Sequence, residues 1–332
     1  MELVRRMSTL EVPQKVYQRL AFIGTITLAL VYLVILAGSV VRASGAGMGC
    51  PDWPKCFGKL IPPTDVSELP ANYREVYAEE HNAVEEFNAT KTWTEYINRL
   101  IGAALGLSIL LQLLFALPLY KTDKWFLVLS FLNLIGIGFQ AWLGAVVVSS
   151  ALSPVKITIH MVMALVILAI GAALLFRIQN RHLSVFPGYP TAVRTTVGIA
   201  LLLTIIQVLI GTQVREEVDV LLDQVARTEI IAGLGISFGI HRVLALVTFF
   251  VNGWLMHLIF TEKASPSLMK RWMLVVMGSI LASVASGLVL AGNDLPAFAQ
   301  PIHLLLACIM FGGQFTLLLY AFKLTPRKDG AR

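Results

Sequence analysis

Eight apolar stretches, each long enough to cross a lipid bilayer as a helix, constrain the fold of this chain more than any other feature. They are rich in Leu, Ile, Val and Ala and lie at roughly 20–41, 96–118, 125–148, 156–176, 193–213, 238–260, 272–291 and 299–321. A spanning helix needs about 20 mostly apolar residues. With 57% hydrophobic and 14% charged residues, the sequence predicts an all-α integral membrane protein with eight transmembrane helices.

The charged residues predict the orientation of these helices. With the N-terminus inside, the inner segments hold 16 Lys and Arg against 5 Asp and Glu, and the outer segments hold 10 against 15. Positive loops stay on the cytoplasmic side. We therefore expect a protein of the cell inner (plasma) membrane with both termini in the cytoplasm. The net charge of +6 follows from this sorting, and we expect no nucleic-acid partner.

The chain also contains an internal duplication. Most matched positions are 143 residues apart, and one segment is offset by 173, as a longer first loop would produce. The matched positions are Gly144 with Gly287, His160 with His303, Asn98-Arg99 with His241-Arg242, and the segment Gly38–Arg42 with Gly211–Arg215. Because each unit has an even number of helices, we expect two tandem four-helix bundles related by a pseudo-two-fold axis along the membrane normal.

This duplication divides the chain into five parts. They are a cytoplasmic N-terminal tail at 1–19, an N-terminal four-helix repeat at 20–177, an inner linker at 178–192, a C-terminal four-helix repeat at 193–322, and a cytoplasmic tail at 323–332. The first repeat includes a long outer loop at 42–95, which begins with a Gly-rich segment. The linker is rich in turn-forming residues.

Three histidines lie near the outer ends of predicted helices. His160, His241 and His303 each follow the outer end of a helix by a few residues, which places them within about 5–8 Å of the outer boundary. A histidine in hydrocarbon is costly, and a metal or haem iron is the commonest strong reason for one. Because the three share one layer, we interpret all of them as candidate metal ligands.

In the C-terminal repeat, His241 and His303 are the predicted axial ligands of a haem. Arg242 and Arg215 lie near the same outer surface and are candidates to pair with the haem propionates. The alternative is that one or both histidines only form hydrogen bonds to backbone carbonyls within the bundle.

In the N-terminal repeat, the matching positions are Asn98 and His160. Asn is a poor iron ligand, so a haem here would be held by His160 alone. Glu95 precedes Asn98 by three residues on the same helix face, and a carboxylate beside an open axial position suits oxygen activation. Arg99 and Arg42 are candidates for the propionates. The alternative is an ordinary polar helix start in which Glu95 and Arg99 form an i, i+4 salt bridge.

Two cysteines lie in the first outer loop. Cys50 and Cys56 are separated by six positions with two prolines between them, so the chain can turn enough to bring the thiols together. An oxidising compartment favours a disulfide, and a reversible thiol pair or two free thiols remain the alternatives.

These motifs resemble those of the haem A synthase family, and the resemblance covers nearly the whole chain. It rests on Gly38–Arg42 with the loop SGAGMGCPDWPKC, on TEYINR at 94–99, on QAWLGA at 140–145 leading to His160, on Gly239–Arg242, and on Ser286-Gly287 leading to His303. The Gly-rich loop with its two cysteines is the most specific of these motifs.

The resemblance implies an eight-helix enzyme that oxidises the C8 methyl group of haem O to a formyl group, giving haem A for terminal oxidases. It gives His241 and His303 the haem b cofactor, His160 the substrate haem, and Glu95 the role of the family's essential glutamate. It also implies a Cys50–Cys56 disulfide. The family motif has His where this chain has Asn98.

Two other functions use the same histidines. One is a di-haem b-type membrane cytochrome for electron transfer, and the other is a haem-binding carrier. The expected partners are haem O, a quinol or redox protein as electron donor, a haem O synthase, membrane lipid and, as a further option, a second copy of the chain.

Overall fold

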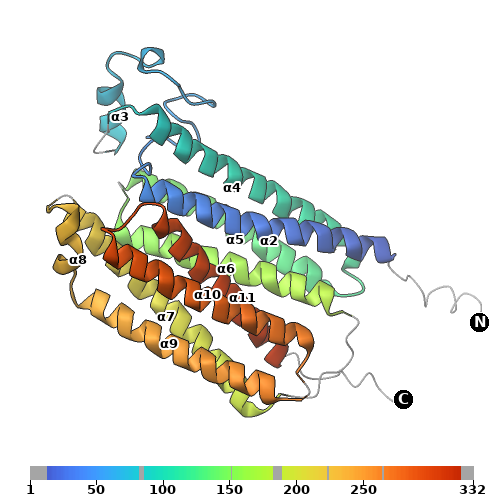
Figure 1. The fold of residues 1–332 in the computed structure, drawn as a ribbon. Coiled ribbons are helices and arrows are strands. Elements are labelled where there is room, and N and C mark those ends of the chain that lie inside the picture. Colours follow the sequence, from blue (N-terminus) through green and yellow to red (C-terminus); the bar gives the residue numbers. More distant parts are fainter. Residues whose placement is uncertain are drawn as a thin grey trace, which may run out of the picture.

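The computed structural model describes residues 13–81, 86–150, 152–181, 189–222, 224–263 and 265–322. Within these ranges the chain is helical and has no β-strand. Eight long helices are apolar enough to cross a membrane, which confirms the predicted all-α membrane fold (Figure 1). They are α2 (Gln14–Ala43), α4 (Ala89–Ala116), α5 (Lys124–Ser149), α6 (Pro154–Gln179), α7 (Thr191–Leu222), α9 (Ile236–Thr261), α10 (Ser267–Gly292) and α11 (Ala299–Phe322). The short helices are η1 (Val66–Glu68), α3 (Tyr73–His81), η2 (Leu117–Leu119), η3 (Arg227–Glu229) and α8 (Ile230–Gly233).

The long helices pack in two groups of four. In the first group, α2 and α5 each contact both α4 and α6. In the second group, α7 and α10 each contact both α9 and α11. The groups meet where α11 packs against α2 and α6. The pseudo-two-fold axis and the boundaries of the repeats stay predictions.

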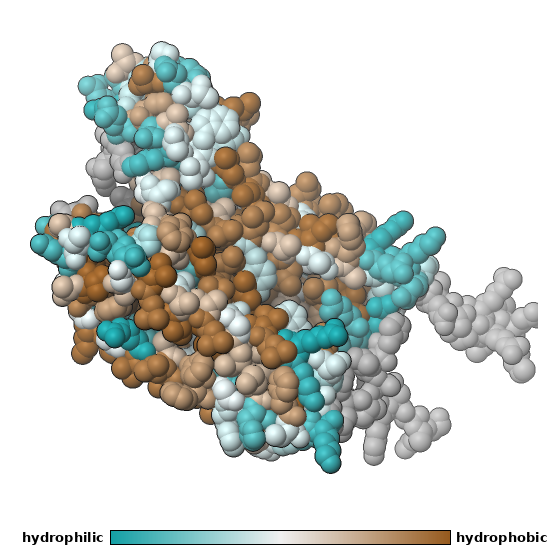
Figure 2. All heavy atoms as spheres, in the orientation of Figure 1, coloured by the Kyte–Doolittle hydropathy of each residue, from teal (hydrophilic) through white to brown (hydrophobic). Residues whose placement is uncertain are grey.

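Apolar side chains both fill the seam between the groups and cover the outer surface. Leu105, Leu168, Val208 and Phe311 belong to one buried cluster that joins helices of both groups. Figure 2 shows apolar side chains over the middle of the helices and hydrophilic ones at their ends. Since lipid is as apolar as leucine, close packing of the interior side chains stabilises this arrangement in the membrane.

Several helices extend beyond their predicted limits, and α4 begins at Ala89, within the predicted outer loop. Helix α2 begins at Gln14, within the predicted tail, and α7 continues to Leu222 instead of ending near 213. No Gly or Pro interrupts the added segment of α7, and Glu217 accepts hydrogen bonds from the backbone N–H of Gly235 and the hydroxyl of Ser237. Residues 1–12 and 323–332 of the predicted tails and 182–188 of the predicted linker lie outside the described residues.

The first outer loop forms a compact cap beyond the N-terminal end of α4 (Figure 1). Its small core packs the Phe57 ring edge-on against Tyr73, Tyr77 and Phe87. Cys50 and Cys56 are joined by a disulfide, which confirms the first of the alternatives for these two residues. The ends of α2 and α11 at Gln14 and Phe322 lie at the opposite end of the molecule from this loop (Figure 1).

Candidate functional site

His241 on α9 and His303 on α11 face each other in the second helix group. Their ring centroids are 6.3 Å apart, and the ring planes are inclined by 56°. Bonds from imidazole nitrogens to metals are about 2 Å long, so two imidazoles on opposite sides of one haem iron have ring centroids roughly 6 Å apart. The observed spacing therefore fits one iron between the two rings.

Neighbouring helices fix the orientation of both rings. The Ser286 hydroxyl on α10 lies 2.8 Å from Nδ1 of His303, which leaves Nε2 of that ring for a ligand. On α7, the Gln207 amide donates to the backbone carbonyl of His241 at 3.0 Å and lies 3.3 Å from its Nε2. The Ser286 contact is of the kind that orients the histidines of metal sites, because it engages the ring nitrogen that does not bind the metal.

A glycine on a neighbouring helix faces each of the four matched ligand positions. A Cβ atom added at the glycine would lie 3.2–3.7 Å from a side-chain atom of the residue opposite, so these glycines make room for the ring or amide. The pairs are Gly211 with His241, Gly287 with His303, Gly144 with His160, and Gly38 with Asn98. The duplication seen in the sequence therefore extends to the local packing of side chains.

Two of these glycines are accompanied by a glutamine one helical turn earlier. Gln140 precedes Gly144 and donates to the backbone carbonyl of His160 at 3.0 Å. Gln207 precedes Gly211 and makes the same bond to His241, also at 3.0 Å. The sequence analysis did not single out Gln207, although the shared Gln-x-x-x-Gly spacing would have identified it.

The first helix group has unpaired polar atoms at the matching positions. Nδ1 of His160 on α6 and Oδ1 of Asn98 on α4 are buried and have no hydrogen-bond partner among the described residues, and the same is true of Nδ1 of His241. Unpaired buried polar atoms are rare in native proteins. These atoms, with the glycines opposite, fit a bound polar or metal-containing group at both sites.

The number of histidines at the two sites matches what a haem iron needs from a protein. Within the part of the chain that the structure describes, no group of three or more His, Cys, Asp and Glu side chains could hold a metal ion. A haem iron needs only one or two ligands from the protein because the porphyrin nitrogens supply the other four. One histidine pair and one single histidine match that requirement.

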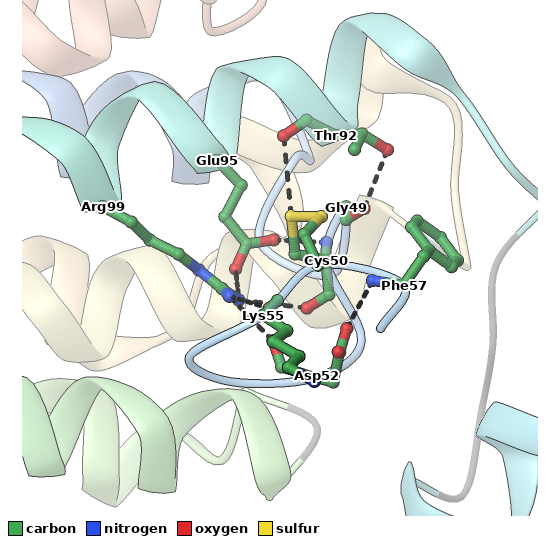
Figure 3. A network of polar contacts seen from close by, with 9 residues as sticks. Gly49, Cys50, Asp52, Lys55, Phe57, Thr92, Glu95 and Arg99 are labelled. Atoms are coloured by element: carbon green, nitrogen blue, oxygen red, sulfur yellow. Dashed lines mark hydrogen bonds and ion pairs between the residues drawn. A yellow bond between two sulfur atoms is a disulfide. The ribbon is translucent and has the colours of Figure 1, made fainter. Parts of the chain in front are cut away.

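Glu95 and Arg99 on α4 bind the disulfide loop (Figure 3). Glu95 is only 3% exposed. Its Oε1 lies 2.6 Å from Nη2 of Arg99, and its Oε2 accepts the backbone N–H of Cys50 at 2.8 Å. Arg99 also donates to the backbone carbonyls of Cys50, Asp52 and Lys55. The structure thus contains the i, i+4 salt bridge between Glu95 and Arg99 that was the alternative prediction. The N–H groups of Arg99 bind the loop and do not face an open pocket.

The loop approaches α4 too closely for any residue but glycine at position 49. The Gly49 carbonyl accepts a hydrogen bond from the Thr92 hydroxyl at 2.8 Å. A Cβ atom at Gly49 would lie 2.6 Å from backbone atoms of Lys91. The Gly-rich motif of this loop therefore has a steric cause.

Two of the three remaining arginine candidates share one carboxylate. Arg42 on α2 and Arg215 on α7 bind opposite oxygens of Asp219, at 2.8 Å and 2.7 Å. The guanidinium of Arg242 lies over the Phe238 ring, 5.6 Å from its centroid. The sequence analysis gave Asp219 no role, although its i+4 spacing from Arg215 was a signal.

Comparisons with known proteins give relatives along almost the whole chain. The COX15-CtaA family model, described as cytochrome oxidase assembly protein, matches residues 21–315. The heme A synthase of an Exiguobacterium species is 26% identical over 331 residues, which cover 95% of this chain and 98% of that protein.

Other relatives match over a shorter length. The heme A synthase of Shewanella oneidensis is 32% identical over 168 residues, 50% of this chain and 47% of the relative. That of Rhodopseudomonas palustris is 30% identical over 213 residues, 57% of this chain and 54% of the relative. The chain thus spans about half the length of these two relatives. Because the family model covers most of the sequence, this chain belongs to the COX15-CtaA family of cytochrome oxidase assembly proteins.

Proposed function

We propose that this protein is a haem A synthase, an oxidoreductase that converts the C8 methyl group of haem O to a formyl group. The observation that carries the proposal is the pair of unequal sites in one duplicated frame. One site has two histidines at a spacing of 6.3 Å, and the matching site has a histidine and an asparagine. One haem with both axial positions filled suits electron transfer, and one with an open position suits oxidation of a substrate. The family and the named relatives support the same activity.

In the second helix group, His241 and His303 would hold a haem b cofactor. When bound, this group supplies one-electron redox chemistry. Ser286 fixes the His303 ring through Nδ1, so that Nε2 points away from α10. Arg242 and Arg215 would pair with the propionates at the outer end of the site.

In the first helix group, His160 would bind the iron of the substrate, haem O. Asn98 occupies the position that matches His241, and as a poor iron ligand it would leave His160 as the single ligand that the protein supplies. Arg42 would contact the substrate propionates. Glu95 remains the carboxylate on which we expect conversion to depend, and its contacts with Cys50 and Arg99 support a role in holding the disulfide loop in position.

The setting of the reaction follows from the charge distribution and from the chemistry of the substrate. We propose that the protein lies in the plasma membrane with both termini in the cytoplasm, so that both sites lie toward the outer side. Haem O is too apolar to travel through water, so a haem O synthase would deliver it laterally. A quinol or a redox protein would supply the electrons.

A di-haem b-type cytochrome is the second candidate. It is favoured because Arg99 and the Cys50 N–H bind the two Glu95 oxygens, so that Glu95 has structural contacts that a cytochrome would also need. Such a cytochrome would use the same three histidines without modifying a haem.

Coexpression with a haem O synthase, in a host that lacks its own haem A synthase, tests the proposal. Haems extracted from the purified protein and the membranes are identified by mass. Formyl haem is the expected product, and cells with the haem O synthase alone are the control. Unchanged haem O together with a reducible b-type spectrum would contradict the synthase and support the cytochrome.

A further inference from the structure

Two guanidinium groups share one carboxylate at the outer end of the seam between the helix groups. Asp219 binds Arg42 through Oδ2 and Arg215 through Oδ1. These three side chains together carry one positive charge more than they carry negative charges, so the trio favours a further anionic group.

The two arginines occupy equivalent positions above the two candidate sites. Arg42 follows Gly38 by four residues, and Arg215 follows Gly211 by four. Residues i and i+4 share a helix face and lie about 6 Å apart along the axis. Each arginine therefore sits one turn outward from a glycine that faces a ligand position.

The contacts with Asp219 are open to exchange. The side chains of Arg42, Arg215 and Asp219 are 27%, 21% and 41% exposed. Ion pairs that are partly open to solvent are weak. A haem propionate is a carboxylate like Asp219, and one directed outward from either site would meet an arginine already bound to the same kind of group.

Asp219 is also a polar link between the two halves of the molecule. It lies on α7 in the second helix group, and its contact with Arg42 on α2 joins residues 177 positions apart. Each arginine belongs to a different site, but both depend on one carboxylate for their position. A change in the charge at residue 219 therefore acts on both sites.

We infer that Asp219 is a counter-ion shared by the two haem sites, which positions Arg42 and Arg215 to receive the propionates of both haems. This inference rests on the proposed function, because it requires a haem in each helix group. A negative charge close to a haem stabilises the ferric form over the ferrous form. Removal of the Asp219 charge should therefore raise the midpoint potentials of both haems.

Redox titration of the purified full-length protein, loaded with haem in cells that contain a haem O synthase, tests this inference. Absorbance is followed against potential for the wild type, Asp219→Asn and Asp219→Glu. The matched control is Glu216→Gln, which removes the same charge three residues away on α7; among the described residues, the ion pairs of both arginines are with Asp219. Asp219→Ser replaces the Asn variant if that variant does not accumulate.

We expect Asp219→Asn to raise the midpoint potentials of both haems by more than Glu216→Gln does. Asp219→Glu should restore both potentials toward the wild-type values. A shift of only one component, or of neither, would overturn the shared role while leaving the proposed function intact. Wild-type protein that binds no haem would overturn the proposed function and this inference with it.

Discussion

At the residue scale, each proposed ligand side chain packs against a glycine on a neighbouring helix. Among the four glycines, Gly211 is the most tightly placed, because its added Cβ would lie 3.2 Å from Cε1 of His241. That distance is tighter than ordinary van der Waals contact, so the ring would have to move. A bis-histidine site tolerates little movement, since both nitrogens must reach one iron.

Gly211→Ala should therefore weaken haem binding at the His241–His303 site. Overpacking of this kind costs about 1–3 kcal/mol, which corresponds to roughly a 5- to 150-fold loss of affinity. The low-spin absorbance per protein, measured during haem titration, reports the change. Gly198→Ala on the same helix is the control, because a Cβ there meets nothing within 4 Å. Equal haem affinity in the two variants would contradict the packing argument.

Asn98 determines the difference between the two sites in our account. Gly38 leaves room opposite it, with an added Cβ 3.7 Å from the Asn98 Oδ1, much as Gly211 does for His241. Asn98→His should therefore give the first helix group a second axial ligand and convert its haem to a six-coordinate low-spin form. Electron paramagnetic resonance should then detect a second low-spin ferric signal. A spectrum unchanged from the wild type would show that residue 98 does not face the iron.

At the element scale, the outer loop and α4 form one unit. The disulfide, the Glu95–Arg99 pair and the Gly49 carbonyl all meet at the first turns of α4 (Figure 3). The loop is thus fixed to the helix that carries Asn98. A movement of the α4 backbone would therefore displace both the outer loop and the first site.

Gly49→Ala should detach this loop from α4. The added methyl group would meet backbone atoms of Lys91 at 2.6 Å, and a backbone that is held in a helix cannot move aside as a side chain can. We expect a loss of about 1–3 kcal/mol in stability and faster proteolysis within the loop. Gly106→Ala, a site on α4 with nothing within 4 Å, should unfold at the wild-type temperature or above. Wild-type thermal stability in Gly49→Ala would contradict the docking described here.

Features local in sequence were predictable at this scale, and features that join distant elements were not. The eight spans follow from hydropathy, and the Cys50–Cys56 disulfide joins residues close together in one loop. The extension of α7 was missed because its charged residues resemble an outer loop, and Glu217 anchors it through contacts with Gly235 and Ser237. The partners of Arg99 and Asp219 depend on tertiary packing, which helical periodicity does not report.

At the scale of the whole molecule, the duplication relates two candidate sites whose proposed ligand sets differ. The matched glycines and proposed ligand residues could be predicted from the sequence because a repeat preserves their spacing. The sequence did not reveal that Arg42 and Arg215 share Asp219, because those contacts cross the seam between helix groups. One frame with two unequal sites is the basis of the proposed division between electron transfer and substrate oxidation.

The most direct test of this account is the absorbance and electron paramagnetic resonance spectrum of purified His303→Ala protein. We predict loss of the bis-histidine low-spin haem, because only His241 would remain as an axial ligand at that site. His257→Ala, which removes a histidine stacked on Trp254 of α9, should keep the wild-type spectrum. A low-spin haem signal in His303→Ala equal to that of the wild type would contradict the assignment of His241 and His303 as the pair that binds the iron.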